Sequence, residues 1–255
     1  MRVFLSVVSH NHSQLIKDLG CLNRLAQQFT IVIKSNVPGE CFDFLNENIY
    51  WINEKYSLGF GENNNIIYSY CEDALEMNRE DIFIVFNPDI VANIDDIELL
   101  IKYMNQESHP IAAVNLFRDK ELSISDNSVR NFPNLIQFSK SFLGLGNTTI
   151  INKNQTHKPT KVDWAAGSFL AFKAYHYKSL KGFDEKYFMY CEDIDICYRS
   201  NLIGYPVTFF PDIKIQHLAE HANRSILSKH FYWHVKSVFR FLLTRKNLTK
   251  SKSSL

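Results

Sequence analysis

The sequence predicts an α/β fold in which helices flank a mostly parallel central sheet. Short apolar runs alternate along the chain with segments whose apolar residues recur every three or four positions. Strands that alternate with helices build parallel sheets through right-handed crossovers. A length of 255 residues, with 45% hydrophobic residues, suits one large domain with a buried core. Ligands of such sheets bind where the strands end, so polar residues at these ends are candidate site residues.

The first 117 residues carry five predicted strands and three predicted helices. The runs at residues 3–8 and 82–86 are continuously apolar, which is typical of strands covered on both faces. Ser13 can cap the first helix, and a glycine-containing turn at residues 59–61 precedes the second. The predicted strands are residues 3–8, 30–34, 49–52, 82–86 and 111–117. The predicted helices are residues 13–29, a segment from the turn to about Asn78, and residues 95–105.

The second part of the chain begins with residues 118–160, which are polar and rich in Asn and Ser without a clear period. This pattern predicts a long irregular segment. The elements expected after it are an apolar stretch at 162–177, a helix at 192–202, strands at 207–210 and 213–217, and a final helix at 226–243. We therefore expect one domain over residues 1–220, with halves at 1–117 and 161–220, and a helical tail over 221–255.

Composition excludes several classes of protein. The formal net charge of +1 argues against a protein that coats nucleic acid with Lys and Arg, so no nucleic-acid partner is expected. The five cysteines form no CxxC pair, which favours a reducing compartment over a disulfide framework. The apolar run at residues 3–8 is too short for a signal peptide. No apolar stretch reaches the roughly 20 residues of a membrane-spanning helix, which predicts a soluble or peripheral protein.

The tripeptide Asn87-Pro88-Asp89 directly follows the predicted strand at 82–86. Proline ends the ladder of hydrogen bonds and turns the chain, so the Asp89 carboxylate is presented at the carboxyl end of the strand. A lone carboxylate there suits a hard divalent cation that takes its other ligands from water and substrate phosphates. The alternative is an ordinary Asp that closes a turn.

Three carboxylates, those of Glu192, Asp193 and Asp195, open the helix predicted at 192–202. Acidic residues in a first turn are favoured by the helix dipole, so helix capping explains them without any chemistry. Dense like charge also raises the pKa of one member toward that of a useful general base. The spacing leaves both interpretations open.

Three further candidates have structural alternatives of their own. His217 ends a predicted strand, where a single histidine is more often structural than a metal ligand. Trp164 and Gly167 lie in the sequence WAAGS, which would place small residues beside a ligand under an aromatic ring or else form buried core. The glycines at 59 and 61 do not form a dinucleotide-binding fingerprint.

Taken in order, these segments resemble family-2 inverting glycosyltransferases of the GT-A fold. Within that family they resemble the bacterial rhamnosyltransferase-like group of O-antigen and polysaccharide assembly. The resemblance covers roughly residues 2–245, and residues 182–195, which read GFDEKYFMYCEDID, are its most specific part. The other segments that carry it are SHN at 9–11, GFGENN at 59–64, NPD at 87–89, WAAG at 164–167, and Arg199, Gly204 and His217.

The resemblance implies a metal site and a general base. Asp89 matches the last Asp of the family's Asp-x-Asp motif, which binds Mg²⁺ or Mn²⁺ on the donor pyrophosphate, and Asn87 departs from the motif's first Asp. His217 matches a position that completes the metal site in several relatives. Asp193 matches the general base that deprotonates the acceptor hydroxyl in a single displacement with inversion, and Glu192 is the alternative base.

The resemblance also implies where the two substrates bind. Residues 1–117 would bind the nucleotide sugar, and residues 161–220 would bind the acceptor and carry the catalytic residues. The donor-side residues are Ser9, Asn11, Asn36, Asn64 and Asn87; Asn36 stands where relatives often carry an acidic residue. The acceptor-side residues are Trp164, Gly167 and Asp195.

The function that the resemblance implies is transfer of L-rhamnose from dTDP-L-rhamnose to a lipid-linked oligosaccharide in bacterial surface polysaccharide synthesis. Three alternatives use a UDP-sugar donor: glucosyl, galactosyl and galactofuranosyl transfer. A fourth is a non-catalytic module on the same fold that binds a sugar nucleotide or glycan. The intact acidic cluster at 192–195 favours an enzyme over this module.

The near-neutral net charge hides a strong asymmetry. The last 35 residues hold eight Lys and Arg and no Asp or Glu, whereas the first 220 residues hold 20 basic and 27 acidic residues. In the tail, apolar residues recur at helical spacing: Leu227, Phe231, Val235, Val238, Phe239 and Leu242. A basic amphipathic helix of this kind either packs on the acidic domain or lies, through residues 226–250, on anionic lipid at the cytoplasmic face of the plasma membrane.

Overall fold

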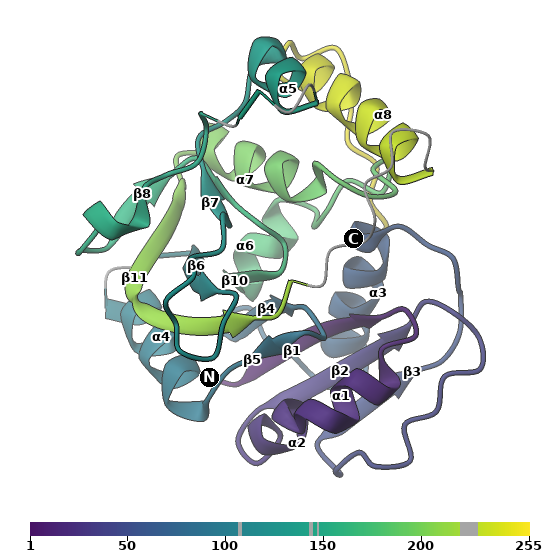
Figure 1. Ribbon diagram of the computed structural model, residues 1–255. Coiled ribbons are helices and arrows are strands. Elements are labelled where there is room, and N and C mark those ends of the chain that lie inside the picture. Colours follow the sequence, from purple (N-terminus) through teal and green to yellow (C-terminus); the bar gives the residue numbers. More distant parts are fainter. Residues whose placement is uncertain (107–108, 143–144, 147, 220–228) are drawn as a thin grey trace.

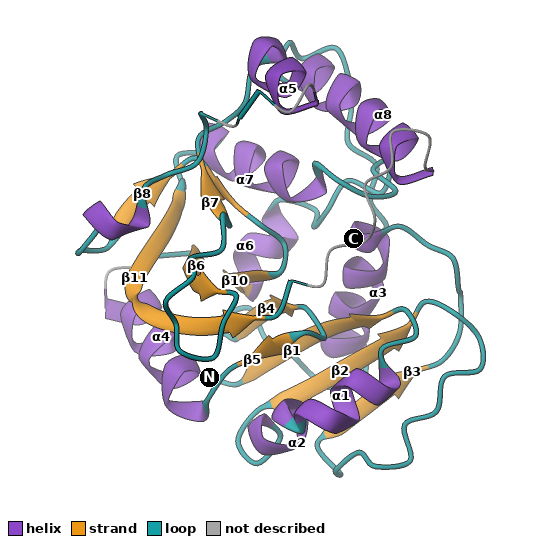
Figure 2. Cartoon of the chain, in the orientation of Figure 1, coloured by secondary structure: helices purple, strands orange, loops and turns teal. Residues whose placement is uncertain are grey.

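A computed structural model of the protein describes residues 1–106, 109–142, 145–146, 148–219 and 229–255. Its central element is a nine-stranded mixed sheet with helices on both faces (Figures 1 and 2). The strands are β1 (Val3–Ser9), β2 (Thr30–Ser35), β3 (Ile49–Ile52), β4 (Ile82–Phe86), β5 (Ile90–Val91), β6 (Ile111–Phe117), β8 (Thr160–Val162), β10 (Phe169–Lys173) and β11 (Val207–His217). A separate two-stranded sheet pairs β7 (Val129–Arg130) with β9 (Trp164–Ala165).

The strand order is β3-β2-β1-β4-β10-β6-β11-β5, and β8 adds to β11. Strands β3, β2, β1 and β4 pair in parallel, as do β6 and β11. Strand β10 lies antiparallel between β4 and β6, so the sheet is mostly but not wholly parallel. All five residues of β4 are buried, which confirms the prediction of a strand covered on both faces.

Two hydrophobic cores cover the two faces of the sheet. One contains residues of α1 (Ser13–Leu19), α2 (Cys21–Leu25) and α4 (Ile94–Gln106). The other contains residues of α3 (Phe60–Asp73), α6 (Ala174–Ser179), α7 (Glu192–Leu202) and α8 (Lys229–Thr244). None of the helices in the described ranges is both long and apolar enough to cross a membrane.

The structure differs from the predicted elements at three places. The helix predicted over 13–29 is broken into α1 and α2 at Gly20, which adopts a left-handed conformation with φ 57°. The two strands predicted near the end form one long strand, β11, with a register shift between Phe210 and Lys214 where Pro211 interrupts the ladder. The helix after Gly61 ends at Asp73 and does not reach Asn78.

The segment 118–160 follows an irregular path and carries α5 (Leu135–Phe142), β7 and a short 3₁₀ turn at Lys153–Gln155. It begins with a tight loop: Asp119 accepts hydrogen bonds from the backbone N–H groups of Ser123 and Ile124. Asp126 N then donates to Leu116 O at 2.9 Å, so the chain returns alongside the end of β6. This return brings Asp126 back to the central sheet.

Glycines 59 and 61 permit a close approach between the start of α3 and the turn that precedes α7. A Cβ atom at Gly61 would lie 2.5 Å from Phe183 Cβ, and one at Gly59 would lie 2.8 Å from the carbonyl oxygens of Tyr187 and Phe188. Phe60 N donates to Phe188 O at 3.0 Å across this contact. The glycine segment is therefore required for packing against the aromatic run at 182–190.

The basic tail packs on the domain through one face of α8. Val238 and Phe241 are buried, whereas Phe239 is 59% exposed, so only part of the predicted apolar stripe packs on the domain. The side chains of successive helix residues point about 100° apart, so Phe239 and Val238 lie on different sides of the helix. Residues 226–228 of the predicted helix, which include Leu227, lie outside the described residues.

One buried ion pair anchors the tail. Arg240 Nε donates to Asp184 Oδ2 at 2.9 Å, and Lys252 N donates to Asp184 Oδ1 at 2.9 Å. The Asp184 side chain is 2% exposed and that of Arg240 is 16% exposed. Asp184 therefore binds both α8 and the C-terminal segment that follows this helix.

We expect Arg240→Ala to lower the free energy of unfolding by about 3 kcal/mol, because it leaves a buried carboxylate without its charged partner. Denaturant unfolding measures this change. Lys246→Ala alters an exposed residue of the same tail and serves as the control, with a change below about 0.5 kcal/mol. Equal losses in the two variants would contradict the anchoring role of the ion pair.

Candidate active site

Polar residues from the carboxyl ends of β1, β2, β4 and β11 gather at one edge of the sheet. Asp89 lies in the turn between β4 and β5, and β5 pairs with the end of β11, which brings His217 beside it. Leu218 N donates to Asp89 O at 3.1 Å, which joins the turn after β4 to the residue after β11. The structure therefore brings together Asp89 and His217, as the resemblance implied.

His217 lies between two carboxylates. Its Nδ1 is 2.8 Å from Asp126 Oδ2 and its Nε2 is 3.4 Å from Asp89 Oδ1. The three side chains are only 12–15% exposed. The first contact is a hydrogen bond, whereas the second is an ion-pair contact that leaves Asp89 Oδ1 buried without a hydrogen bond in the described structure.

The pKa values of these groups follow from their mutual charge. Burial alone would lower the pKa of His217, but the hydrogen bond to Asp126 and the carboxylate of Asp89 raise it to about 9. Burial alone would raise the pKa of Asp89 and of Asp126, but the adjacent His217 holds both below their ordinary value. His12, at the end of β1, also lowers the pKa of Asp89.

Asp126 is a site residue that the sequence analysis missed. It lies in the segment expected to be irregular, 91 positions before its partner His217, and no local motif marks it. Arg118 Nε lies 3.8 Å from Asp126 Oδ1, and Lys153 adds positive charge nearby. Only the return of the chain past Leu116 places this carboxylate behind the histidine ring.

Asp89 and His217 fit a divalent cation. A carboxylate oxygen without a hydrogen bond faces the imidazole Nε2, and hard divalent ions accept such oxygen and nitrogen ligands. The described residues contain no cluster of three His, Cys, Asp or Glu side chains that could hold an ion alone. Further ligands would come from water and from the phosphates of a substrate.

A short series of hydrogen bonds connects the turn that contains Asp89 to the acidic start of α7. Asn87 N donates to Ser168 O at 2.9 Å, and the adjacent Gly167 N donates to Asp193 Oδ2 at 3.2 Å. A Cβ atom at Gly167 would lie 3.1 Å from the Phe60 ring and 3.6 Å from Asp193 Cβ. Gly167 therefore lies between Asp193 and Phe60, and Asn87 and Asp193 contact the same short segment.

Glu192 and Asp193 differ in exposure and in hydrogen bonding. Glu192 is 7% exposed, and its Oε2 has no hydrogen-bond partner in the described structure. Asp193 is half-buried and accepts hydrogen bonds from the N–H groups of Gly167 and Ile194. Burial and the charge of Asp193 raise the pKa of Glu192 well above its usual value. Burial also raises the pKa of Asp193, but the two N–H groups oppose the rise.

Asp195 has a structural environment. It is 1% exposed, accepts a hydrogen bond from Arg199 Nε at 2.7 Å, and is 3.3 Å from the Tyr187 hydroxyl. Arg199 in turn donates to the carbonyl oxygens of Leu180 and Gly182. Asp195 thus ties α7 to the preceding turn.

The donor-side residues also form contacts of their own. The Asn36 side chain pairs with the backbone of Leu58 at 2.9 Å in both directions, and buried Asn64 bonds to Ser6 Oγ at 2.7 Å and Phe60 O at 2.9 Å. Ser9 Oγ donates to Glu40, a buried acid that the sequence analysis did not single out. Asn11 is exposed and left-handed, with φ 64°.

Trp164 is a buried residue, and the pocket described after it lies away from Asp89 and His217. Trp164 is 7% exposed, donates to Asn131 O at 3.0 Å and has Arg130 over its ring, so its contacts stabilise β9, of which it is the first residue.

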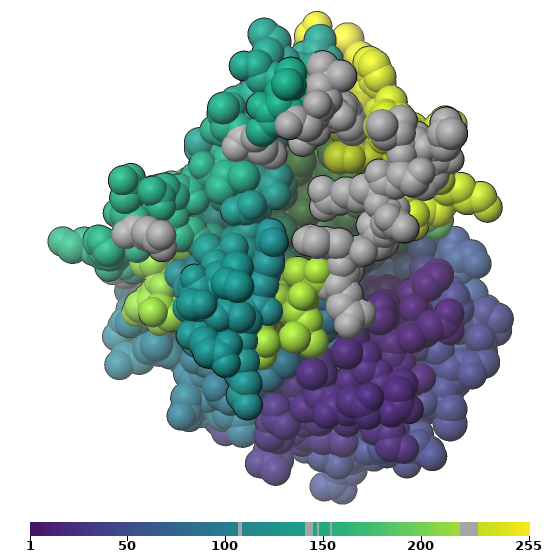
Figure 3. Space-filling model, in the orientation of Figure 1, coloured from purple at the N-terminus to yellow at the C-terminus, as the bar shows by residue number. Residues whose placement is uncertain are grey.

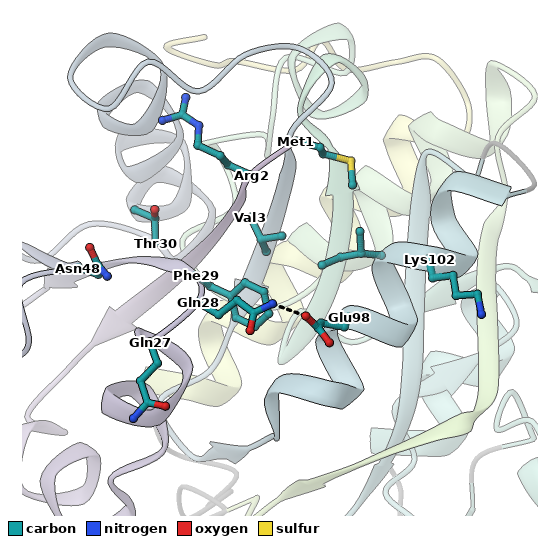
Figure 4. A pocket seen from close by; sticks show the side chains of 11 residues that line it. Met1, Arg2, Val3, Gln27, Gln28, Phe29, Thr30, Asn48, Glu98 and Lys102 are labelled. Atoms are coloured by element: carbon teal, nitrogen blue, oxygen red, sulfur yellow. Dashed lines mark hydrogen bonds between the residues drawn. The ribbon is translucent and has the colours of Figure 1, made fainter.

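A pocket of about 530 Å³ lies at the opposite edge of the sheet, where β1 and β2 begin (Figure 4). Arg2, Thr30, Glu98 and Lys102 are among its lining residues, and it contains none of the site residues.

Sequence relatives are glycosyltransferases. The chain is 36% identical over 258 residues to rhamnosyltransferase WbbL of Escherichia coli K12, a match that covers 97% of this chain and 95% of the relative. It is 29% identical over 180 residues to N-acetylglucosaminyl-diphospho-decaprenol L-rhamnosyltransferase of Mycobacterium tuberculosis, covering 68% of this chain and 58% of that protein. No protein-family model matches the chain.

Solved structures agree on the fold. Staphylococcus aureus TarS superposes with a TM-score of 0.60 over all of this chain and 41% of its own. GalNAc-T7, solved with UDP, GalNAc and Mn²⁺, superposes with a TM-score of 0.58 over 89% of this chain and 46% of its own. Both are 12% identical to this chain, so they establish the fold alone.

We expect the stability of the protein in EDTA to fall as the pH rises from about 6.5 to about 9. The folded-state pKa of His217, about 9, is raised from 6.5. The stability that its protonated ring contributes is therefore fully present below pH 6.5 and is lost as the pH passes through the folded-state pKa. One such group changes the free energy of unfolding by at most about 1.4 kcal/mol per pH unit.

Denaturant unfolding at several pH values measures this slope. His217→Gln removes the titrating ring and should flatten the profile in this window. His157→Gln changes an exposed histidine outside the site and should leave the profile unchanged. The same slope in wild type and His217→Gln would show that this histidine does not hold the raised pKa.

Proposed function

Because this chain belongs to the family-2 glycosyltransferases of the GT-A fold, we propose that it transfers L-rhamnose from dTDP-L-rhamnose to a lipid-linked oligosaccharide. Two relatives are rhamnosyltransferases, which supports rhamnose as the sugar, and the name of one includes a polyprenyl diphosphate acceptor. The product would be an extended glycan of a bacterial surface polysaccharide. The single displacement inverts the configuration at the anomeric carbon.

The observation that carries this proposal is the continuity of the site. Asp89 and His217 offer ligands to a cation, and Asp193 is positioned two hydrogen bonds away through Ser168 and Gly167. A group that holds the donor diphosphate and a base for the acceptor hydroxyl are the two requirements of glycosyl transfer from a nucleotide sugar. The segment that precedes β10 links the two groups, because Ser168 contacts Asn87 and Gly167 contacts Asp193.

Asp89 and His217 would hold Mg²⁺ or Mn²⁺ on the donor diphosphate. The bound ion supplies positive charge that stabilises the departing nucleoside diphosphate. Asp126 holds the His217 ring by its Nδ1, which leaves Nε2 directed toward Asp89. Such a carboxylate behind a ligating histidine fixes the orientation of the ring and its tautomer.

Asp193 acts as the general base. Its partly buried carboxylate takes the proton of the acceptor hydroxyl while that oxygen attacks the anomeric carbon, and the bond to the diphosphate oxygen breaks on the opposite face. Glu192 is more deeply buried and lacks a hydrogen bond to its Oε2, and burial together with the charge of Asp193 raises its pKa well above the usual value. The N–H groups of Gly167 and Ile194 favour the charged form of Asp193, so it is the better placed of the two to act as the base.

The donor side would use residues at the ends of β1 and β2. Asn11 is exposed there, and Asn87 lies next to Asp89 with its backbone bonded to Ser168. Asn36, Asn64 and Ser9 shape this side from behind through their contacts with Leu58, Ser6 and Glu40. Gly167 keeps the acceptor side narrow beside Phe60, and Trp164 and Asp195 support it.

A donor panel tests the function. We expect release of dTDP from dTDP-L-rhamnose in the presence of a polyprenyl-diphospho-oligosaccharide, and little release of UDP from UDP-glucose, UDP-galactose or UDP-galactofuranose. EDTA should abolish release, and Mn²⁺ or Mg²⁺ should restore it. A UDP-sugar as the best donor would overturn rhamnose, and release from no donor would favour a binding module.

Asp193→Asn should reduce transfer by roughly 10²–10⁴-fold, because the amide cannot accept the hydroxyl proton. Binding of the donor, measured by calorimetry, should stay within a few-fold of wild type. Glu192→Gln is the matched variant on the neighbouring residue and should retain more activity. If Glu192→Gln loses as much as Asp193→Asn or more, the assignment of the base is wrong.

A further inference from the structure

The outer faces of α5 and α8 expose large apolar side chains among lysines. On α8, exposed residues recur at positions 232, 236, 239 and 243, which is one face of a helix. On α5, Leu135 is 56% exposed and Ile136 is 65% exposed. We call the following set the α5–α8 surface: Leu135, Ile136, Lys140, Lys236, Phe239 and Leu243.

The two helices lie side by side at one end of the molecule (Figures 1 and 3). Phe138 of α5 and Phe241 of α8 meet with ring centroids 6.4 Å apart, and Arg245 Nη1 donates to Pro133 O at 2.9 Å. Phe241 also contacts Phe132 and Tyr198. Because both helices bury their inner residues in this aromatic cluster, their exposed faces point away from the domain.

The two segments of the sequence that contain α5 and α8 carry charge of one sign. Residues 127–162, which contain α5, and residues 221–255, which contain α8, include none of the 27 Asp and Glu of the chain. They hold 13 of its 28 Lys and Arg. Arg240 is neutralised by Asp184, whereas Lys140, Lys236 and Lys246 are exposed. The α5–α8 surface therefore combines apolar side chains with exposed lysines.

We propose that the α5–α8 surface docks the protein on an anionic lipid bilayer. Isolated Leu, Ile and Phe side chains enter the boundary between headgroups and acyl chains, and lysines on the same face pair with anionic headgroups. A protein partner of matching charge would need a complementary pocket, whereas a bilayer accepts a convex surface of this composition. Lipid binding by the tail helix was one of the two interpretations that the sequence left open, and α5 adds a second, neighbouring contact.

Helix α8 contacts the turn that precedes the candidate base. Ser237 Oγ donates to Met189 O at 2.9 Å, and Trp233 packs on Phe188 with ring centroids 4.6 Å apart. These contacts fall on the turn that leads directly into Glu192 and Asp193. Docking would therefore hold the acceptor side near the membrane. This link to the acceptor rests on the proposed function, whereas the docking itself does not.

Vesicle flotation with the full chain tests the docking without donor or acceptor. We expect wild type to float with vesicles of phosphatidylcholine and phosphatidylglycerol but not with phosphatidylcholine alone, and high salt should weaken binding. Ile136→Ser on α5 and Phe239→Ser on α8 should each weaken binding by roughly tenfold, since each removes one inserted side chain. Lys236→Glu should weaken it further than either.

Ile203→Ser is the matched control, because Ile203 is 52% exposed but lies at the end of α7. It should bind as wild type does. Failure of wild type to bind anionic vesicles, equal binding to neutral vesicles, or an undiminished Ile136→Ser variant would each overturn the proposal. A dimer in solution that Phe239→Ser disrupts, without vesicle binding, would reassign the surface to contacts between copies of the chain. Thermal unfolding of each variant confirms that it remains folded.

Discussion

The register between β4 and β10 determines the rest of the site. Strand β10 pairs antiparallel with β4 so that Phe169 faces Phe86, and Asn87 N then reaches Ser168 O at 2.9 Å. This single hydrogen bond connects the turn of Asp89 to the segment that binds Asp193. Because a shift by one residue would turn every side chain to the other face of the sheet, the buried residues of both strands enforce this register.

Carboxylates near α7 divide into two kinds according to their partners. Asp184 and Asp195 are buried against Arg240 and Arg199, so their charge is compensated and they stabilise the tail and the helix start. Asp193 is held by backbone N–H groups, and the Glu192 carboxyl oxygen Oε2 has no hydrogen-bond partner in the described structure. Burial raises the pKa of Asp193, although these N–H groups and the charge of Arg130 oppose the rise.

Helix α8 has one face packed on the domain and one face exposed to solvent. Its inner face packs on Phe132, Tyr198 and the turn at Met189, and the pair of Asp184 with Arg240 secures it. Its outer face retains Phe239 and Leu243 in contact with solvent. The two interpretations of the basic tail that the sequence left open are therefore compatible, because packing and exposure concern opposite sides of the helix.

The sequence by itself determined the alternation of strands and helices, the buried strands such as β4, and the family, since these depend on local periodicity and on motifs within a few residues. It also located Asp89, Asp193 and His217, because each lies at the end of an element. Only the tertiary structure decided that Asp126 orients His217, that Asp195 is an ion-pair partner of Arg199, and that α5 lies beside α8. These contacts join residues of different elements whose partners have no sequence signature, and the strand register and the path of segment 118–160 bring them together.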